Sequence, residues 1–363
     1  MYGVPKNMGN TEKQRRGAYK LDFERIKRLS DGIKRVKAVM LGDLCLDVYW
    51  SADMTKSSLS RETAHFPLPV VNERFSPGAG ANVANCMAAL SPASVKVLGV
   101  IGDDWRGDVL RKLLKENGTI CSDGVITVKG RLTNAYCKPM RFGYSGVETE
   151  DPRIDFENYS PLPKDAEEEL LSVLDGAVSG AGVLTVSDQM ACGCITPRVR
   201  ERITKYASDG LRVLVDSRDR IGLYGGVLLK PNERECALAL GMRGDALGGG
   251  ASDEDIVGAA KALSARCRSD VCLTLGDRGS LFVGGDDTIF TPAVTCVGET
   301  DTVGAGDAFL SALSLAFAAG ADAASACALA SLAAGVTVRK IGVTGTADAS
   351  EIISLSEGSD VRD

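Results

Sequence analysis

Histidine is almost missing from this sequence, which contains one, His65, among 363 residues. A single histidine argues against Ser-His-Asp catalysis and against metal sites built from several imidazoles. The sequence also has no CxxC pair, and Cys192 and Cys194 stand too close together for a zinc site by themselves. It contains neither a GxxxxGKS/T loop nor the HRD and DFG motifs, so P-loop and protein-kinase chemistry are unsupported.

The sequence also has a small net charge and no long uninterrupted apolar run. A net charge of −6 argues against broad binding to nucleic acid or anionic membranes, although it allows a local basic pocket for a phosphate. The first 20 residues are polar and basic, unlike a secretory signal. The longest apolar region, 310–338, is interrupted by Gly320-Ala321-Asp322, which predicts two packed helices and not a membrane span. The eleven cysteines, an odd number without a CxxC pair, indicate reduced thiols, so we expect a cytoplasmic protein. From the net charge and the interrupted apolar region we expect no nucleic-acid or membrane partner.

Short apolar segments alternate with helical patterns along most of the chain. Strand-like runs lie at 38–41, 95–101, 183–187, 211–216, 227–229 and 271–275, and segments with helical spacing separate them. This alternation predicts an α/β protein, a three-layer α/β/α sandwich around a mainly parallel sheet. Two regions, 46–75 and about 125–145, lack long helices and predict a small antiparallel β-sheet that forms a lid over a cleft.

The pattern divides the chain into three parts. Residues 1–35 form an N-terminal extension, expected to be disordered up to about residue 18 and helical over 21–33. Residues 36–350 form the core domain with its lid. Residues 351–363 are a C-terminal tail.

The stretch DTVGAGDAF, 301–309, is the most informative in the sequence. It separates a strand-like run, 288–297, from a helical run, 308–319, so small residues lie at a helix N-terminus. Free N–H groups and the helix dipole favour an anion there. Asp307 follows directly, and an anion site beside a base suits phosphoryl transfer to a hydroxyl. For this motif alone, a tight turn and an N-cap remain the alternative.

Polar side chains near the first strand suit a sugar. Asp47 follows that strand at its carboxyl end, where open α/β sheets bind ligands. Gly78 would let a substrate approach the backbone, and Asn82 can both donate to and accept from a diol. The alternatives are an aspartate that fixes a loop and a small-residue turn that allows close helix–sheet packing.

Two later motifs suit a nucleotide. Asn232 and Glu235 lie on one face of a helix's first turn, where a carboxylate could hold Mg²⁺ through water. The same spacing satisfies a capping box. Thr274 to Gly279 is a strand that runs into a glycine turn, which alone is a weak hairpin signal.

With these motifs in this order, residues 36–350 resemble the PfkB/ribokinase family of carbohydrate kinases. The matched series is GD…D, a small-residue turn plus Asn, GxxGxDxxG, PNxxE, TxGxxG and GAGD. The N-terminal half is most similar to the kinase domain of D-glycero-β-D-manno-heptose-7-phosphate kinases, through segments such as Ser60-Arg61-Glu62 and Arg153-Ile154-Asp155. We expect no cytidylyltransferase domain of the kind often fused to such kinases. Ala79, Gln189 and Ser331 depart from the family pattern and leave the acceptor open.

The resemblance implies a role for each matched residue. Asp307 corresponds to the catalytic base, and Gly304, Ala305 and Gly306 to the anion hole. The nucleotide positions are Asn232, Glu235, Thr274, Gly276 and Gly279, with Glu235 also at the Mg²⁺ site. Asp301 matches a position that holds a monovalent cation such as K⁺, and Asp47, Gly78 and Asn82 match the sugar site.

Three cations in or near the expected lid suit a phosphate already present on the sugar. They are Lys138, Arg141 and Arg153, and a guanidinium binds phosphate in a bidentate way. The alternative is a solvated surface with ordinary ion pairs.

The sequence therefore predicts an ATP- and Mg²⁺-dependent kinase for a sugar or sugar phosphate, with heptose 7-phosphate as the named acceptor. Ribose, fructose, a ketodeoxy sugar acid and a nucleoside are alternative acceptors. A non-catalytic sugar or nucleotide sensor is the alternative from another class, and the intact segment Gly304 to Asp307 argues against it. A homodimer through the lid is a further implication of the resemblance.

Overall fold

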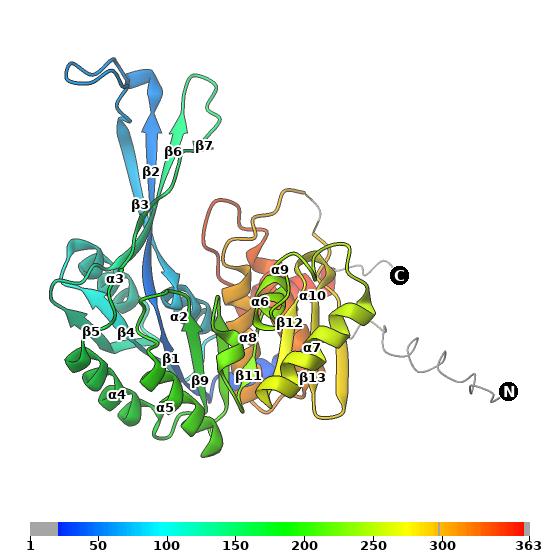
Figure 1. Ribbon diagram of the computed structural model, residues 1–363. Helices are drawn as coiled ribbons and strands as arrows, with labels where there is room; N and C mark the ends of the chain where they lie inside the picture. The colour runs from blue at the N-terminus through cyan, green and yellow to red at the C-terminus, as the bar shows by residue number, and fades with distance from the viewer. Residues whose placement is uncertain (1–20, 297, 359–363) are drawn as a thin grey trace.

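The alternation of strands and helices builds a large sheet between two helical layers, with a smaller sheet projecting from one end (Figure 1). The structure is a computed structural model that describes residues 21–296 and 298–358. The expected disorder up to about residue 18 lies outside the described residues. The predicted three-layer architecture with a mainly parallel sheet is confirmed.

The large sheet has nine strands in the order β14-β13-β12-β11-β10-β9-β1-β4-β5. Their bounds are β1 (Lys37–Gly42), β4 (Ser94–Gly102), β5 (Ile120–Val128), β9 (Val183–Asp188), β10 (Val213–Ser217), β11 (Leu228–Leu229), β12 (Asp270–Thr274), β13 (Ser280–Gly284) and β14 (Asp287–Thr291). Strands from β12 to β5 run parallel, and the hairpins β12–β13 and β13–β14 are antiparallel. The parallel strands bring their carboxyl ends to one edge, where ligands bind in such sheets.

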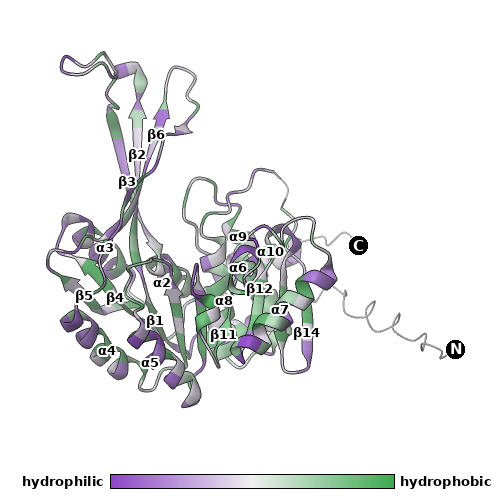
Figure 2. Cartoon of the chain, viewed as in Figure 1, coloured by the Kyte–Doolittle hydropathy of each residue, from purple (hydrophilic) through white to green (hydrophobic). Residues whose placement is uncertain are grey.

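The helices cover both faces of this sheet. They are α1 (Phe23–Ile33), α2 (Gly80–Ala89), α3 (Trp105–Glu116), α4 (Lys164–Val178), α5 (Pro197–Ser208), α6 (Glu233–Ala239), α7 (Asp253–Cys267), α8 (Ala305–Ala318), α9 (Ala323–Thr337) and α10 (Ala349–Gly358). Alternate residues of β1 enter different cores: Met40 packs with α2, α8 and α9, and Leu41 with α4 and α5. Figure 2 shows the result, with apolar strands inside and polar faces on the outer helices.

The small sheet has five strands: β2 (Leu44–Asp53), β3 (Val70–Ala79), β6 (Asn134–Phe142), β7 (Thr149–Glu150) and β8 (Ile154–Phe156). The expected lid ranges overlap it, although 125–128 belongs to β5 of the large sheet. The sheet is mixed and not purely antiparallel, because β2 and β6 pair in parallel. Both strands leave the main body in the same direction, since a long excursion through β4 and β5 separates them.

Element ends differ from the sequence expectation in three places. Strand β14 ends at Thr291, whereas the strand-like run was expected to continue to residue 297. Helix α8 begins at Ala305, three residues earlier than expected, so Gly306 and Asp307 lie inside its first turn. The expected C-terminal tail begins inside α10, whose Ile352 and Leu355 are buried. Among the residues that the structure describes, no helix is both long and apolar enough to cross a membrane.

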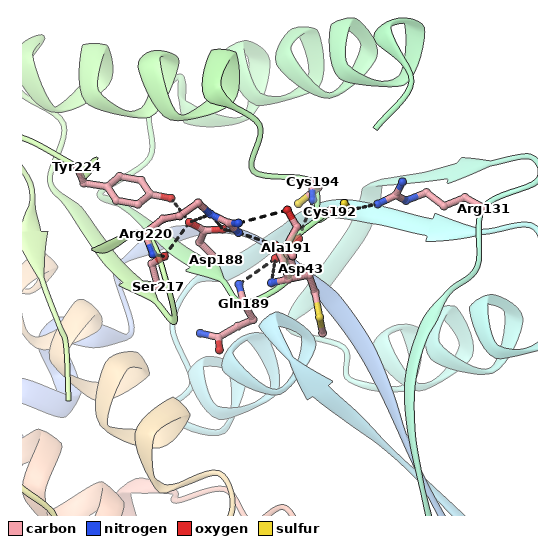
Figure 3. A network of polar contacts seen from close by, with 11 residues as sticks. Asp43, Arg131, Asp188, Gln189, Ala191, Cys192, Cys194, Ser217, Arg220 and Tyr224 are labelled. Carbon is pink, nitrogen blue, oxygen red and sulfur yellow. Dashed lines mark hydrogen bonds and ion pairs between the residues drawn. The ribbon is translucent and has the colours of Figure 1, made fainter. Parts of the chain in front are cut away.

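Buried carboxylates fix the loop that follows β9 (Figure 3). Asp43 accepts backbone N–H groups of Gln189, Met190 and Cys194 at 2.7–2.9 Å. Asp188 accepts from Ser217 and Tyr224, both at 2.8 Å, and forms an ion pair with Arg220. Because both carboxylates are saturated with protein donors, they hold the loop and are not free to bind a ligand.

Candidate functional site

The N-terminus of α8 has the geometry that the sequence predicts for an anion site. Its N-cap, Gly304, has φ +81°, a left-handed conformation that favours glycine. A Cβ there would also lie 3.1 Å from Thr344 Cγ2 and 3.2 Å from Asn82 Nδ2. Ala305 and Gly306 open the helix and line a cavity of about 1070 Å³. Their small size leaves the first N–H groups of the helix accessible to an anion in that cavity.

Asp307 stands in the same turn and lines the same cavity. Its Oδ2 accepts a hydrogen bond from Nδ2 of Asn82 at 2.7 Å. Burial raises the pKa of Asp307 to about 7, and the negative charge of Asp216 adds to this rise while the Asn82 amide opposes it. A carboxyl group that titrates near neutral pH suits a general base.

Asp47 lies close to this pair, on β2. It is 6% exposed, and its Oδ2 accepts from Oγ1 of Thr344 at 3.4 Å. Burial raises its pKa, and Lys138, whose Nζ lies 3.8 Å from Asp47 Oδ2, opposes the rise. A Cβ at Gly78 would lie 2.7 Å from Asp47 Oδ1, so only glycine leaves the carboxylate in this position. The predicted sugar residues therefore lie together, with Thr344 between Asp47 and Gly304.

The five predicted nucleotide residues line the cavity beside α8, together with apolar residues from 293–296 and from α9. Asn232 and Glu235 form a complete capping box, with their two hydrogen bonds at 2.8 and 2.9 Å. The capping-box interpretation is thus correct, and it coexists with the position of Glu235 in the cavity. Burial raises the pKa of Glu235 to about 7, and the charge of Asp216 reinforces this.

The glycine turn after β12 lines the same cavity. Thr274 donates its N–H and its hydroxyl to the carbonyl of Pro231, at 2.9 and 3.3 Å, which ties the turn to the start of α6. Gly276 and Gly279 have φ +60° and +97°. A Cβ at Gly279 would lie 2.0 Å from the carbonyl oxygen of Thr291, so this position excludes every larger residue.

The three cations expected to bind a sugar phosphate do not share one place. Lys138 donates to the Tyr49 hydroxyl at 3.0 Å and lies beside Asp47. Arg153 binds Asp155 through two hydrogen bonds of 2.6 and 2.7 Å, and it stacks on Tyr136, which is paired with Asp47 in the sheet.

Arg141 lies elsewhere, farther along β6. It pairs with Asp151 at 3.1 Å, and its register partner on β2 is Ala52, five residues beyond Asp47. At about 3.3 Å per residue this places Arg141 roughly 16 Å from the register of Asp47.

Asp301, the expected cation position, acts between two loops. Its Oδ1 accepts the N–H of Val303 and its Oδ2 the N–H of Gly342, both at 3.0 Å. Asp301 does not line the cavity. Within 21–296 and 298–358, no three His, Cys, Asp or Glu side chains group closely enough to hold a metal ion. A metal here would need oxygen atoms of a ligand or of water to complete its shell.

The sequence reasoning missed residues that complete the site. Thr344 joins Asp47 to the start of α8, and Arg74 stacks on Tyr49 at 3.8 Å while it donates to the carbonyl of Gly342 at 2.7 Å. Lys230, recognised only as part of a motif, is a buried lysine that lines the cavity. Only the position of Lys230 before PNxxE offered a signal, since Thr344 and Arg74 belong to segments without a pattern.

The comparisons with known proteins agree with this geometry. A family model described as pfkB family carbohydrate kinase matches residues 223–349, which include Glu235, Gly279 and Asp307. Residues 223–349 are therefore similar to PfkB carbohydrate kinases. The match begins before α6 and ends at α10, so it includes most residues that line the cavity but not Asp47 or Asn82.

Curated relatives extend the likeness to the other side of the site. The chain is 30% identical over 336 residues to a bifunctional protein HldE of Hyphomonas neptunium, covering 90% of this chain and 65% of that protein. It is 34% identical over 331 residues to a bifunctional protein HldE of Caulobacter sp., covering 88% of this chain and 62% of that protein. The chain therefore spans just under two thirds of the length of these relatives.

Solved structures show the same fold as this protein. The ribokinase of Arabidopsis thaliana, solved with ribose and ATP, has a TM-score of 0.67 at 20% identity, covering 90% of this chain and all of that one. Phosphofructokinase-2 of Escherichia coli, solved with substrates and products, has a TM-score of 0.69 at 21% identity, covering 89% and 98%. The architecture is thus ribokinase-like.

Proposed function

We propose that the protein is an ATP-dependent kinase that phosphorylates a hydroxyl of a sugar or sugar phosphate. The observation that carries this proposal is the position of Asp307. It lines a cavity large enough for a nucleotide, and it binds Asn82, which belongs to the group of polar residues around Asp47. A base at the boundary between a donor cavity and an acceptor site is what transfer between two substrates requires.

The proposed step is a direct displacement. Asp307 accepts the proton of the acceptor hydroxyl, whose oxygen forms a bond to the γ-phosphorus. The bond from that phosphorus to the β–γ bridging oxygen breaks, and its electron pair leaves with ADP. The N–H groups at the start of α8, from Ala305 to Asp307, stabilise the charge on the transferred group.

Glu235 is the residue of this site that fits Mg²⁺. Its Oε2 accepts the N–H of Asn232, and among the described residues its Oε1 makes no hydrogen bond. One carboxylate with water and phosphate oxygens is a usual Mg²⁺ site in phosphoryl transfer. When bound, Mg²⁺ would neutralise charge on the phosphates, while Glu235 would position it beside α6.

Asp307→Asn should lower kcat by a factor of about 10²–10⁴, because the amide cannot take the hydroxyl proton. The measurement is ATP consumption across free and phosphorylated sugars, including heptose 7-phosphate, ribose and fructose. In the wild type, kcat/KM should rise as pH increases through about 7, since only the ionised form of Asp307 is a base. An unchanged kcat in the variant removes Asp307 from the reaction, and no turnover by either protein favours a sensor.

The acceptor that we propose carries a phosphate, as in a heptose 7-phosphate. Lys138 and Arg153 lie near Asp47, and both lower the pKa that burial raises there. Arg74, also near Asp47, makes no ion pair with a described carboxylate. Three cationic side chains thus act on Asp47, and a phosphate on the acceptor is a group that they could bind. The HldE relatives support the same class of acceptor.

Lys138→Met should raise KM for the phosphorylated sugar about tenfold with a smaller effect on kcat, because a charge-assisted hydrogen bond is lost. Lys56→Met is the matched control, since Lys56 is an exposed lysine of the small-sheet region that pairs with Asp53. An equal KM in wild type and Lys138→Met contradicts the proposal. In the same assay, a raised KM for Arg141→Met would show that the far end of β6 also binds the phosphate of the sugar, and an unchanged KM would show that it does not.

We also propose that K⁺ binds close to Asp301 and supports the anion site. Asp301 fixes the loop before α8 and the 338–342 segment, so a cation bound there would order both. Turnover should be higher in K⁺ than in Na⁺ or in buffer without either ion. Equal rates in all three contradict the proposal.

Pairing of two small sheets in a homodimer is the remaining part of this proposal. Strand β3 is an edge strand, and Val70 and Val71 are each 49% exposed on it. Exposed apolar edges favour association. Sedimentation should show a dimer for the wild type and a monomer for Val71→Lys. A monomeric wild type at micromolar concentration contradicts it.

A further inference from the structure

Lys230 is a buried charged group that the proposed transfer leaves without a role. It follows β11, and its N–H donates to the carbonyl of Val215 at 2.9 Å, which extends the sheet by one residue. The residue is 3% exposed, yet it lines the large cavity. Lysine is rarely buried to this degree unless its charge is used.

The ammonium group of Lys230 is only partly satisfied by the protein. Among the described residues, its one carboxylate partner within 4.0 Å is Asp216, with Nζ 3.3 Å from Oδ2. An ammonium has three N–H donors, so this single contact leaves capacity for other acceptors. The group also lies against the first turn of α8, because a Cβ on Gly306 would be 4.0 Å from Nζ.

The surroundings keep Lys230 charged. Burial alone would lower its pKa, but the negative charges of Asp216, Glu235 and Asp307 outweigh burial and raise it. Asp216 is itself 6% exposed, so the two charges form a buried pair at the ends of β10 and β11. Such a pair holds its members in a fixed position, since moving either one leaves the other unpaired.

We propose that Lys230 contacts the phosphoryl group while it is transferred, and that Asp216 positions Lys230 for this contact. The inference rests on the proposed kinase function. The anion site at Gly306 and the ammonium face the same part of the cavity. Lysine binds phosphate as a point charge, and a preorganised cation stabilises the charge on a transferring group.

The competing interpretation is an ion pair that only stabilises the fold by joining β10 to β11. The chain offers an ion pair of that kind, whose arginine is more exposed than Lys230. Arg198 and buried Glu167, 2.6 Å apart, join α4 to α5 and do not line the cavity. A purely structural Lys230 should behave like Arg198, with effects on thermal stability and none on ligand selectivity.

The test compares Lys230→Met and Lys230→Arg with Arg198→Met in the full chain. Calorimetry with ATP and with ADP, each with Mg²⁺, measures affinity without knowledge of the acceptor. Lys230→Met should weaken ATP binding about tenfold and leave ADP binding nearly unchanged, because the lost contact is to the terminal phosphoryl group. On the acceptor that the wild type uses, kcat should fall about 10²-fold. Lys230→Arg should retain most of the ATP preference, and Arg198→Met all of it.

The outcomes separate this inference from the proposed function. A Lys230→Met protein with the ATP-to-ADP selectivity and kcat of the wild type overturns the role of Lys230 alone. A wild type that binds neither nucleotide overturns the kinase proposal as well. Thermal melting establishes that each variant is folded, and if Lys230→Met does not fold, Lys230→Gln repeats the comparison with a polar, uncharged side chain.

Discussion

The hydrogen bond from Asn82 to Asp307 joins the two halves of the site, and the geometry around it depends on this contact. Asn82 belongs to α2 and Asp307 to α8, helices that are 225 residues apart in sequence but pack together in one core. Ser311 reinforces the contact, since its hydroxyl donates to the carbonyl of Val83 at 2.9 Å. A Cβ on Gly304 would lie 3.2 Å from Nδ2 of Asn82, so a side chain there would press on the amide that binds Asp307. The small residues of GAGD therefore allow this close packing and also leave the first N–H groups of α8 open to the cavity.

The carboxyl edge of the large sheet divides its acidic residues between structure and chemistry. Asp43 and Asp188 have the position of ligand-binding residues, but backbone N–H groups and Arg220 saturate them. Asp47 and Asp307 have fewer protein partners, and burial raises the pKa of both. A carboxylate with unused lone pairs in a desolvated place is costly for folding, and such costs concentrate at functional sites. The number of hydrogen-bond partners thus distinguishes Asp43 and Asp188 from Asp47 and Asp307, whereas their positions in the sequence do not.

Much of the fold could be predicted from the sequence, because strand and helix periodicities are local properties. That the residues assigned to the nucleotide come together could be predicted too, since PNxxE and GAGD are contiguous motifs at strand ends, and these residues line one cavity. Long-range pairing was harder. Lys138 and Arg141 are three residues apart and look like one basic cluster, but the register of β6 against β2 separates them along the strand. Thr344 and Arg74 enter the site from segments far apart in sequence, so no local pattern could reveal them.

The charges that line the cavity explain why a divalent cation suits the proposed reaction. The acidic side chains are Asp216, Glu233, Glu235, Asp277 and Asp307, and the basic ones are Arg218, Lys230 and Arg234. Glu233 pairs with Arg278 and Asp216 with Lys230, so the remaining acids and bases come close to balance. A triphosphate would add several negative charges to this cavity and repel Glu235 and Asp307. A cation held between Glu235 and the phosphates would remove that repulsion. The charge of Lys230 would then be left to act on the terminal phosphoryl group.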